Sequence, residues 1–254
     1  MSPNGSSEAG TGGAPRRILH CLRAPVGGLF RHVFDLAAEQ ARRGHHIGII
    51  CDTTTGGAGA KAKLAALEPF CDLGIIRLPI GRLPGLGDLR ALLPVARIAS
   101  AARAEILHGH GAKGGAYARL APYGGAQRPV LRFYTPHGGS LHYSPGSAAG
   151  YAFLAAERAM MRRTGGLIFE SAYGEATYSA KVAPPSCPAR VIHNGVSKEE
   201  FAPVEPVAKP ADLVFIGELR ELKGVSVLLK ALSRLQGGGI GPRAVIVGDG
   251  AGRA

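Results

Sequence analysis

Short apolar runs alternate with segments of helical periodicity along most of the chain. The first run, 18–22, precedes apolar side chains at helical spacing from Phe30 to Ala41, and Gly44 marks the end of that helix. The same alternation predicts strands at 46–51, 75–78, 105–108, 130–134, 166–169 and 190–193. It predicts further helices at 89–102, 114–121, 151–163 and 173–181. Because the strands are almost wholly apolar, we expect a doubly wound α/β fold, a parallel sheet covered by helices on both faces.

Changes in composition divide the chain into four parts. Residues 1–15, rich in Gly, Ser and Ala, predict a disordered tail, and 16–201 carry the alternating pattern of a Rossmann-like N-terminal domain. The proline-rich segment 202–210 predicts a linker. Residues 211–254 begin a second α/β pattern, with strands at 213–216 and 244–247 and a helix at 225–235. The segment has about 45 residues, which is fewer than the roughly 100 of an ordinary domain. We therefore expect a second Rossmann-like domain that is incomplete.

The charge of the chain narrows the classes of partner. A net charge of +12 suits nucleic acid, an anionic membrane surface or a phosphate-bearing substrate. The sequence has no ribonucleoprotein aromatic motif, no zinc-finger spacing and no concentrated Lys/Arg tract, so we predict no nucleic-acid partner. The predicted helix 151–163 carries Arg158, Arg162 and Arg163, and either touches anionic lipid peripherally or packs on its own sheet.

Cysteine usage and the lack of membrane signals predict the compartment. The four cysteines are widely spaced, and the sequence shows neither a signal peptide nor an apolar run that could span a bilayer. We expect a cytoplasmic protein, with a peripheral position at the inner face of the membrane as an extension of that expectation.

Candidate binding residues follow the predicted strands. In an open parallel sheet, ligands bind beyond the carboxyl ends of the strands. Gly27 and Gly28 come after the first strand, where they either let the backbone approach a phosphate or form a tight turn. His110 and His137 follow two other strands on the same rim, where imidazole can hydrogen-bond a sugar hydroxyl or a phosphate.

The segment 106–156 has no acidic residue. It contains Lys113, Arg119, Arg128 and Arg132, which suits it to an anion. His108 and His110 have the His-x-His spacing of metal ligands, but no carboxylate or cysteine lies nearby in the sequence. We therefore predict no metal site.

Residues 109–114 match the G-x-G-x-x-G pattern of dinucleotide-binding folds. That pattern needs an acidic ribose ligand about 20 residues further on, and none exists there. Asp52 at the end of the second strand leaves a nicotinamide enzyme as a minor alternative. Lys223 lies at the N-terminal edge of the predicted helix 225–235, and Arg220 lies one turn away. Each is either a phosphate ligand at this helix start or an exposed charge near the helix cap.

Six pieces in a fixed order support a family resemblance. They are Gly-Gly-Leu at 27–29, Leu-His-Gly-His-Gly-Ala-Lys at 107–113, Thr-Pro-His-Gly at 135–138, Val-Ile-His-Asn-Gly-Val at 191–196, Gly-Glu-Leu-Arg-Glu-Leu-Lys-Gly at 217–224 and Val-Ile-Val-Gly-Asp-Gly at 245–250. Together they resemble the family 4 glycosyltransferases, whose GT-B architecture consists of two Rossmann-like domains.

The resemblance implies a retaining hexosyltransferase of polysaccharide biosynthesis. It implies transfer of a sugar from a nucleotide-sugar, which is a co-substrate, to a glycan, lipid-linked or small-molecule acceptor, without a cofactor. The implied roles are catalysis at His137, donor and phosphate binding at Gly27, Gly28, Arg220 and Lys223, and further substrate contacts at His110 and Asn194.

Two departures from the family pattern limit this expectation. Glu218 stands where the family usually has Arg, and Arg220 is the candidate replacement. The family's pair of glutamates that bind donor sugar and ribose would fall beyond Ala254, so we expect a C-terminally truncated chain with weak donor binding and little or no turnover. The alternative is a non-catalytic module, derived from such a transferase, that binds an acceptor or a partner.

Overall fold

The computed structural model describes residues 13–82, 85–125, 129–205, 209–250 and 252. The predicted tail 1–15 lies almost entirely outside these residues, as does 206–208 of the predicted linker. The chain forms two compact units, Met1–Gly195 and Val196–Ala254, so the division falls between Gly195 and Val196. The sequence had placed it after residue 201.

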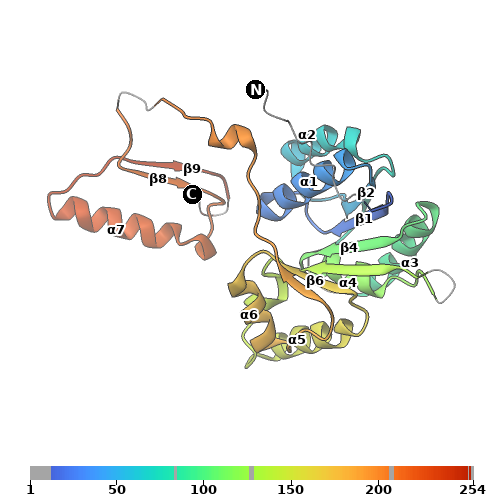
Figure 1. The fold of residues 1–254 in the computed structure, drawn as a ribbon. Coiled ribbons are helices and arrows are strands. Elements are labelled where there is room, and N and C mark those ends of the chain that lie inside the picture. The colour runs from blue at the N-terminus through green and yellow to red at the C-terminus, as the bar shows by residue number, and fades with distance from the viewer. Residues whose placement is uncertain (1–12, 83–84, 126–128, 206–208, 251, 253–254) are drawn as a thin grey trace, which may run out of the picture. The chain divides into compact units, whose positions relative to one another are not determined.

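A seven-stranded parallel sheet is the centre of the first unit (Figure 1). The strand order is β3-β2-β1-β4-β5-β6-β7, and each paired register is parallel. The strands are β1 (Arg17–Leu22), β2 (His46–Asp52), β3 (Ile75–Leu78), β4 (Ile106–His110), β5 (Leu131–Thr135), β6 (Gly166–Phe169) and β7 (Ala189–Val191). The predicted doubly wound α/β fold is confirmed.

Helices connect successive strands of this sheet. They are α1 (Gly27–Arg42), α2 (Gly57–Leu67), α3 (Leu86–Ala101), α4 (Gly111–Leu120), α5 (Ala148–Met161) and α6 (Ala172–Lys181), with short 3-10 turns η1 (Glu68–Phe70) and η2 (Gly139–His142). The sequence did not predict α2. Its residues are mostly Ala, Gly and Lys, and only Ala60, Leu64 and Leu67 are buried, so its apolar stripe is too thin to recognise.

Alternate residues of the central strands enter two separate cores. Leu19 and Cys21 of β1 pack with α3 and α4, whereas Ile18 and Leu22 pack with α1 and α2. In β4, Ile106 belongs to the second of these faces and Leu107 to the first. Residues of even number in β1 and β4 therefore face α1, and this register determines where the histidines of both strands lie.

A third core links β5 and β6 with η2, α5 and α6. Its polar centre is the fully buried ion pair between Arg119 Nη2 and Glu157 Oε2, 2.7 Å apart. The other carboxylate oxygen of Glu157 accepts hydrogen bonds from Tyr134 and Ser140, each at 2.9 Å. Because Ser140 lies in η2, this network fixes the loop that follows β5.

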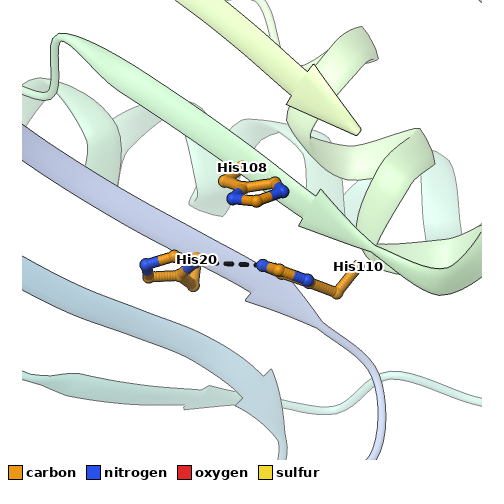
Figure 2. Close-up of side chains that lie close together, drawn as sticks. All are labelled: His20, His108 and His110. Carbon is orange, nitrogen blue, oxygen red and sulfur yellow. Dashed lines mark hydrogen bonds between the residues drawn. The ribbon is translucent and has the colours of Figure 1, made fainter. Parts of the chain in front are cut away.

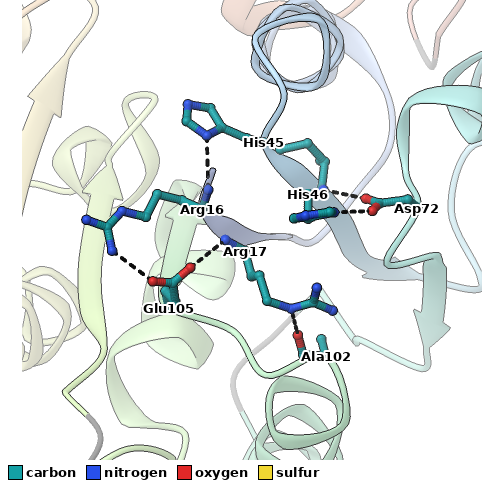
Figure 3. Close-up of polar contacts among 8 residues, drawn as sticks. Arg16, Arg17, His45, His46, Asp72, Ala102 and Glu105 are labelled. Carbon is teal, nitrogen blue, oxygen red and sulfur yellow. Dashed lines mark hydrogen bonds and ion pairs between the residues drawn. The ribbon is translucent and has the colours of Figure 1, made fainter. Parts of the chain in front are cut away.

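The amino ends of β1, β2 and β4 are joined by polar contacts (Figure 3). Glu105 accepts hydrogen bonds from the Arg16 side chain at 2.8 Å and from the Arg17 backbone at 3.0 Å. Asp72 pairs with His46 at 2.5 Å and accepts from Ile47 N at 2.9 Å. This edge is tied by its own side chains, and the candidate ligand-binding residues lie at the opposite edge.

The second unit is small and contains two parallel strands. It consists of η3 (Lys198–Phe201), β8 (Leu213–Ile216), η4 (Glu221–Lys223), α7 (Val225–Gly237) and β9 (Ala244–Val247). Apolar side chains remain exposed on it, including Val214 at 60% and Ile216 at 77%. Within the described residues of the whole chain, every helix is too short or too polar to cross a membrane.

Candidate active site

Five of the nine histidines gather at the carboxyl edge of the large sheet. Centroid distances between neighbouring rings range from 4.0 to 5.8 Å. They are His20 of β1, His32 of α1, His108 and His110 of β4, and His137 of the loop after β5. Segments more than 100 residues apart in the sequence therefore build one cluster.

The register of β4 explains why two of these rings are adjacent. The sequence predicted that the strand ends at His108, and this was wrong, because pairing with β1 and β5 continues to His110. Side chains two apart on a strand share a face. His108 and His110 consequently lie with ring centroids 4.0 Å apart, next to His20 of the neighbouring strand (Figure 2).

A chain of hydrogen bonds runs through the cluster to a carboxylate. His20 Nε2 lies 2.8 Å from Gln40 Oε1, and His20 Nδ1 lies 3.0 Å from His110 Nε2. His110 Nδ1 is 3.2 Å from His137 Nε2, and His137 Nδ1 is 2.7 Å from Glu170 Oε1. Glu170 follows β6, so the chain crosses the edges of four neighbouring strands, β1, β4, β5 and β6.

Burial sets the charge state of the inner rings. It lowers the pKa of His20 to about 4, because only the hydrogen bond with Gln40 opposes the loss of hydration. Burial likewise lowers the pKa values of His108 and His110 well below the ordinary value, and neighbouring histidines lower them further. The inner part of the cluster is therefore neutral at physiological pH.

The outer end of the cluster opens into a small cleft of about 160 Å³. His137 and Glu170 line it, with Leu141, Tyr173 and Thr177. Burial alone would raise the pKa of Glu170, but the hydrogen bond and charge of His137 outweigh it and hold that pKa below its usual range. The cleft thus has an anionic carboxylate backed by imidazole.

The backbone at His137 has an uncommon conformation. His137 has φ 50°, and Gly138 and Gly139 that follow have φ 75° and 30°. A non-glycine residue in the left-handed region is uncommon, and such residues concentrate at functional sites. A Cβ on Gly139 would lie 3.0 Å from the amide nitrogen of Ala112, so this turn packs directly on the start of α4.

Asn194 joins the same group from the segment after β7. Its Oδ1 lies 2.7 Å from His32 Nδ1, and its Nδ2 donates to Glu170 Oε1 at 3.3 Å. The predicted residues His110, His137 and Asn194 are therefore brought together, although the substrate roles predicted for them remain predictions.

Gly27 and Gly28 form the first turn of α1, whereas the sequence had placed them in a loop before the helix. Gly27 has φ 67°, and an added Cβ at either glycine would meet nothing within 4 Å. The space beside these two Cα atoms is thus open. Helices α4 and α6 also begin at the carboxyl edge, so three N-termini with positive partial charge surround the cluster.

The glycines of 109–114 have a packing role. A Cβ on Gly114 would lie 2.1 Å from the carbonyl oxygen of Cys21, and one on Gly109 would lie 2.5 Å from Cα of Gly115. They permit close approach of α4 to β1 and β4. Their match to a dinucleotide pattern is therefore explained by helix-sheet contact.

The cations of 106–156 are mostly engaged within the protein. Lys113 pairs with Asp88 at 2.7 Å, and Arg119 pairs with Glu157. Arg132 donates to the backbone carbonyls of Ala118, Ala121 and Tyr123. Arg128 lies outside the described residues. The expectation that this interval attracts an anion through these side chains is not supported, because their partners come from outside the interval or from the backbone.

Asp52 holds the loop after β2. It accepts hydrogen bonds from the hydroxyls of Thr54 and Thr55 and from the backbone of Ile80. Burial raises the pKa of Asp52, but these hydrogen bonds prevail and bring it to about 2. The carboxylate is thus already bonded within its own loop, which removes the reason for considering it a ribose ligand.

In the second unit, the two predicted phosphate ligands lie close together in sequence at the start of α7. Lys223 ends η4, and Arg220 precedes it. Arg220 Nε lies 3.1 Å from the Glu218 carboxylate. Glu218 stands where the family usually has Arg, and it pairs with Arg220, the residue predicted to replace that Arg.

Sequence reasoning missed Glu170, His20, His32 and Gln40. Glu170 follows an apolar strand directly, so the strand-end rule applied to 166–169 would have found it. His20 is a lone polar residue in an apolar strand, which is a usable signal. His32 and Gln40 carry none, since both look like ordinary polar positions of an amphipathic helix.

A parallel sheet with histidines and helix N-termini collected at its carboxyl edge is a ligand-binding domain of the Rossmann-like class. The family described as "Glycosyl transferase 4-like domain" matches residues 27–195. The chain belongs to this family. No curated protein matches the chain significantly.

Solved structures show the same fold. A glycosyltransferase from Rickettsia africae has a TM-score of 0.65 and 19% identity, over 93% of this chain and 61% of that one. Anabaena Alr3699/HepE, solved in complex with UDP-glucose, has a TM-score of 0.65 and 19% identity over 92% and 61%. The chain thus spans about 61% of the length of these relatives and has the fold of GT-B glycosyltransferases.

Proposed function

We propose that the chain is the acceptor-side domain and part of the donor-side domain of a retaining glycosyltransferase that uses a nucleotide-sugar. The observation that carries the proposal is the hydrogen-bonded series from His20 through His110 and His137 to Glu170 at the carboxyl edge. Family membership supports transferase chemistry. UDP-glucose bound to the Anabaena relative supports a nucleotide-sugar as donor.

The geometry suits a donor at this edge. The open N-terminus of α1 at Gly27 and Gly28 favours an anion, as a diphosphate is, because backbone amides and helix dipole act together. His137 has a left-handed backbone conformation, and its ring nitrogens lie 2.7 Å from Glu170 Oε1 and 3.2 Å from His110 Nδ1. In the proposed complex, His137 Nε2 exchanges its His110 partner for a hydroxyl of the donor sugar, while Asn194 keeps Glu170 in place.

The proposed chemistry depends on charge stabilisation. As the bond between sugar and diphosphate lengthens, positive charge develops on the sugar and negative charge on the leaving diphosphate. Glu170 stabilises the first by its negative charge, and helix amides stabilise the second, with Lys223 and Arg220 as the further phosphate ligands that the family resemblance implies. Transfer of this kind needs no cofactor.

A donor screen tests the proposal. The chain is incubated with a panel of nucleoside diphosphate sugars, and ligand-observed NMR measures binding while release of nucleoside diphosphate measures turnover. We expect saturable binding of one donor class and slow hydrolysis or none, because only part of the donor-side unit is present. A chain that binds none of the panel at millimolar concentration contradicts the proposal.

The proposed acceptor is a glycan, a lipid-linked saccharide or a small molecule. We propose that the protein transfers a hexosyl group to it during polysaccharide assembly.

Peripheral contact with an anionic membrane at the cytoplasmic face belongs to the same proposal. Helix α5 packs Leu154 and Met161 into the core, and Arg162 and Arg163, which follow the helix directly, are exposed. Binding to anionic vesicles that disappears in an Arg162→Glu/Arg163→Glu variant is the expected result.

A further inference from the structure

We propose that His32, His110 and His137 form a three-histidine site for a divalent transition metal, with Zn²⁺ as the best-suited ion. This goes beyond the proposed sugar transfer, which needs no metal. The two uses exclude each other at His137 Nε2, because a metal bound there blocks the contact with the donor sugar. Each of the three rings offers a nitrogen, and these nitrogens all lie within 4.8 Å of one another. The rings come from α1, β4 and the loop after β5, so the fold assembles the site from distant segments.

An unpartnered nitrogen points to a ligand. His32 Nε2 is buried and has no hydrogen-bond partner among the described residues. A buried polar atom without a partner costs free energy, on the order of 1–3 kcal/mol, unless something else satisfies it. His32 Nδ1 already pairs with Asn194, so Nε2 is the nitrogen that remains available.

The hydrogen bonds on the far side of each ring select the tautomers that a metal requires. Asn194 donates its Nδ2 to Glu170, so its Oδ1 faces His32 and accepts from the Nδ1 of that ring. Glu170 accepts from His137 Nδ1. Neutral rings with these protons present a lone pair at Nε2 of His32 and at Nε2 of His137.

His110 completes the set through the inner chain. With Gln40 Oε1 as acceptor, His20 donates from Nε2 and accepts from His110 Nε2, which leaves a lone pair on His110 Nδ1. Every proposed ligand thus has its other ring nitrogen bonded to an oxygen or an imidazole. This outer arrangement is the one that fixes ring orientation in metal sites of proteins.

The distance between two of the proposed ligand nitrogens suits a bound metal ion. His110 Nδ1 and His137 Nε2 are 3.2 Å apart. Two ligands at roughly 2.0–2.1 Å from a tetrahedral Zn²⁺ lie about 3.3 Å from each other. Three histidines leave a fourth position for an oxygen ligand.

A second group, His20, His108 and His110, competes for the same role. These three rings lie close together (Figure 2). All three are buried, and His108 Nε2 forms a hydrogen bond with Thr135 Oγ1 at 2.9 Å. No nitrogen of this inner group is a buried atom without a hydrogen-bond partner, whereas His32 Nε2 of the outer group is one. The outer group is therefore the proposed site.

Metal binding by the full chain tests the proposal directly. Protein prepared without a polyhistidine tag is stripped with chelator, and Zn²⁺ stoichiometry is measured by equilibrium dialysis in the absence of any sugar donor. We expect one Zn²⁺ per chain, and Co²⁺ should give visible absorption bands of a tetrahedral nitrogen site. Because no donor is present, the result is independent of the proposed transferase function.

Variants identify the ligands. His32→Gln should abolish the site, and Glu170→Gln should weaken binding about 10- to 100-fold through the His137 ring. His45→Gln, a matched substitution at a histidine outside the cluster, should leave binding unchanged, and circular dichroism reports whether each variant is folded. Unchanged binding in His32→Gln overturns the proposal, and so does absence of saturable binding by the unaltered chain. Loss in folded His108→Gln with retention in His32→Gln assigns the metal to the inner group instead.

Discussion

At the scale of single residues, burial and hydrogen bonding determine which side chains of the histidine cluster and its neighbours are charged. His20 and His110 are neutral because burial dominates, while Glu170 is anionic because His137 and Asn194 outweigh burial. The inner imidazoles are therefore neutral, and the series ends in one carboxylate at the cleft.

Asp52 gives a residue-scale prediction. The pKa of Asp52 is about 2 in the folded chain against about 3.9 when unfolded. A lowered folded pKa means that the stabilisation is complete above pH 4 and is lost as the pH falls toward 2. Above pH 4 the unaltered chain should be more stable than Asp52→Asn by about 2 kcal/mol. Urea unfolding of both proteins at pH 5 and at pH 2.5 measures the gap, and a gap that does not narrow contradicts this account.

At the scale of elements, α4 can approach β1 and β4 because its contact positions lack side chains. The contact also determines the position of His110, which immediately precedes α4, and of the His137 turn packed on Ala112. Close helix-sheet packing is thus a condition for assembling the site.

Alanine substitutions test this packing. In Gly114→Ala, the new Cβ would lie 2.1 Å from the Cys21 carbonyl oxygen, so α4 must shift. We expect a loss of at least about 1–3 kcal/mol in the free energy of unfolding. Gly59→Ala in α2, where a Cβ meets nothing within 4 Å, is the control and should be neutral or stabilising by about 0.4–1 kcal/mol. Thermal unfolding followed by circular dichroism compares them, and equal melting temperatures would refute the packing role.

The sequence was informative where one physical signal dominates. Apolar strands such as 166–169 were predicted within a residue or two, whereas α2 was missed because Ala and Gly give no periodic contrast. The site was predictable only in part. His110 and His137 were found from their place after strands, and the same rule applied to 166–169 finds Glu170. Gln40, which orients His20, acts through a contact between α1 and the sheet, which local patterns do not encode.

At the scale of the whole molecule, the two units differ in how well they cover their apolar surface. The large sheet has helices and cores on both faces, whereas β8 and β9 expose Val214, Ile216 and Val247. Hydrogen exchange tests the consequence, because poorly covered elements open more readily. We expect amides of 213–254 to exchange much faster than those in the strands of 18–196. Equal protection would contradict this expectation and show that other contacts cover the apolar side chains of the second unit.

The proposed transfer depends on contact between His137 and the donor sugar, and one comparison of affinities tests this contact. Titrations followed by NMR give the Kd of a bound nucleoside diphosphate sugar and of its sugar-free nucleoside diphosphate, for the unaltered chain and for His137→Ala. Loss of a hydrogen bond worth about 0.5–1.5 kcal/mol should weaken the sugar-bearing ligand by roughly 2- to 13-fold and leave the diphosphate unchanged. His45→Ala, at a histidine at the opposite edge of the sheet, is the control. Equal weakening of both ligands, or of neither, would contradict the account.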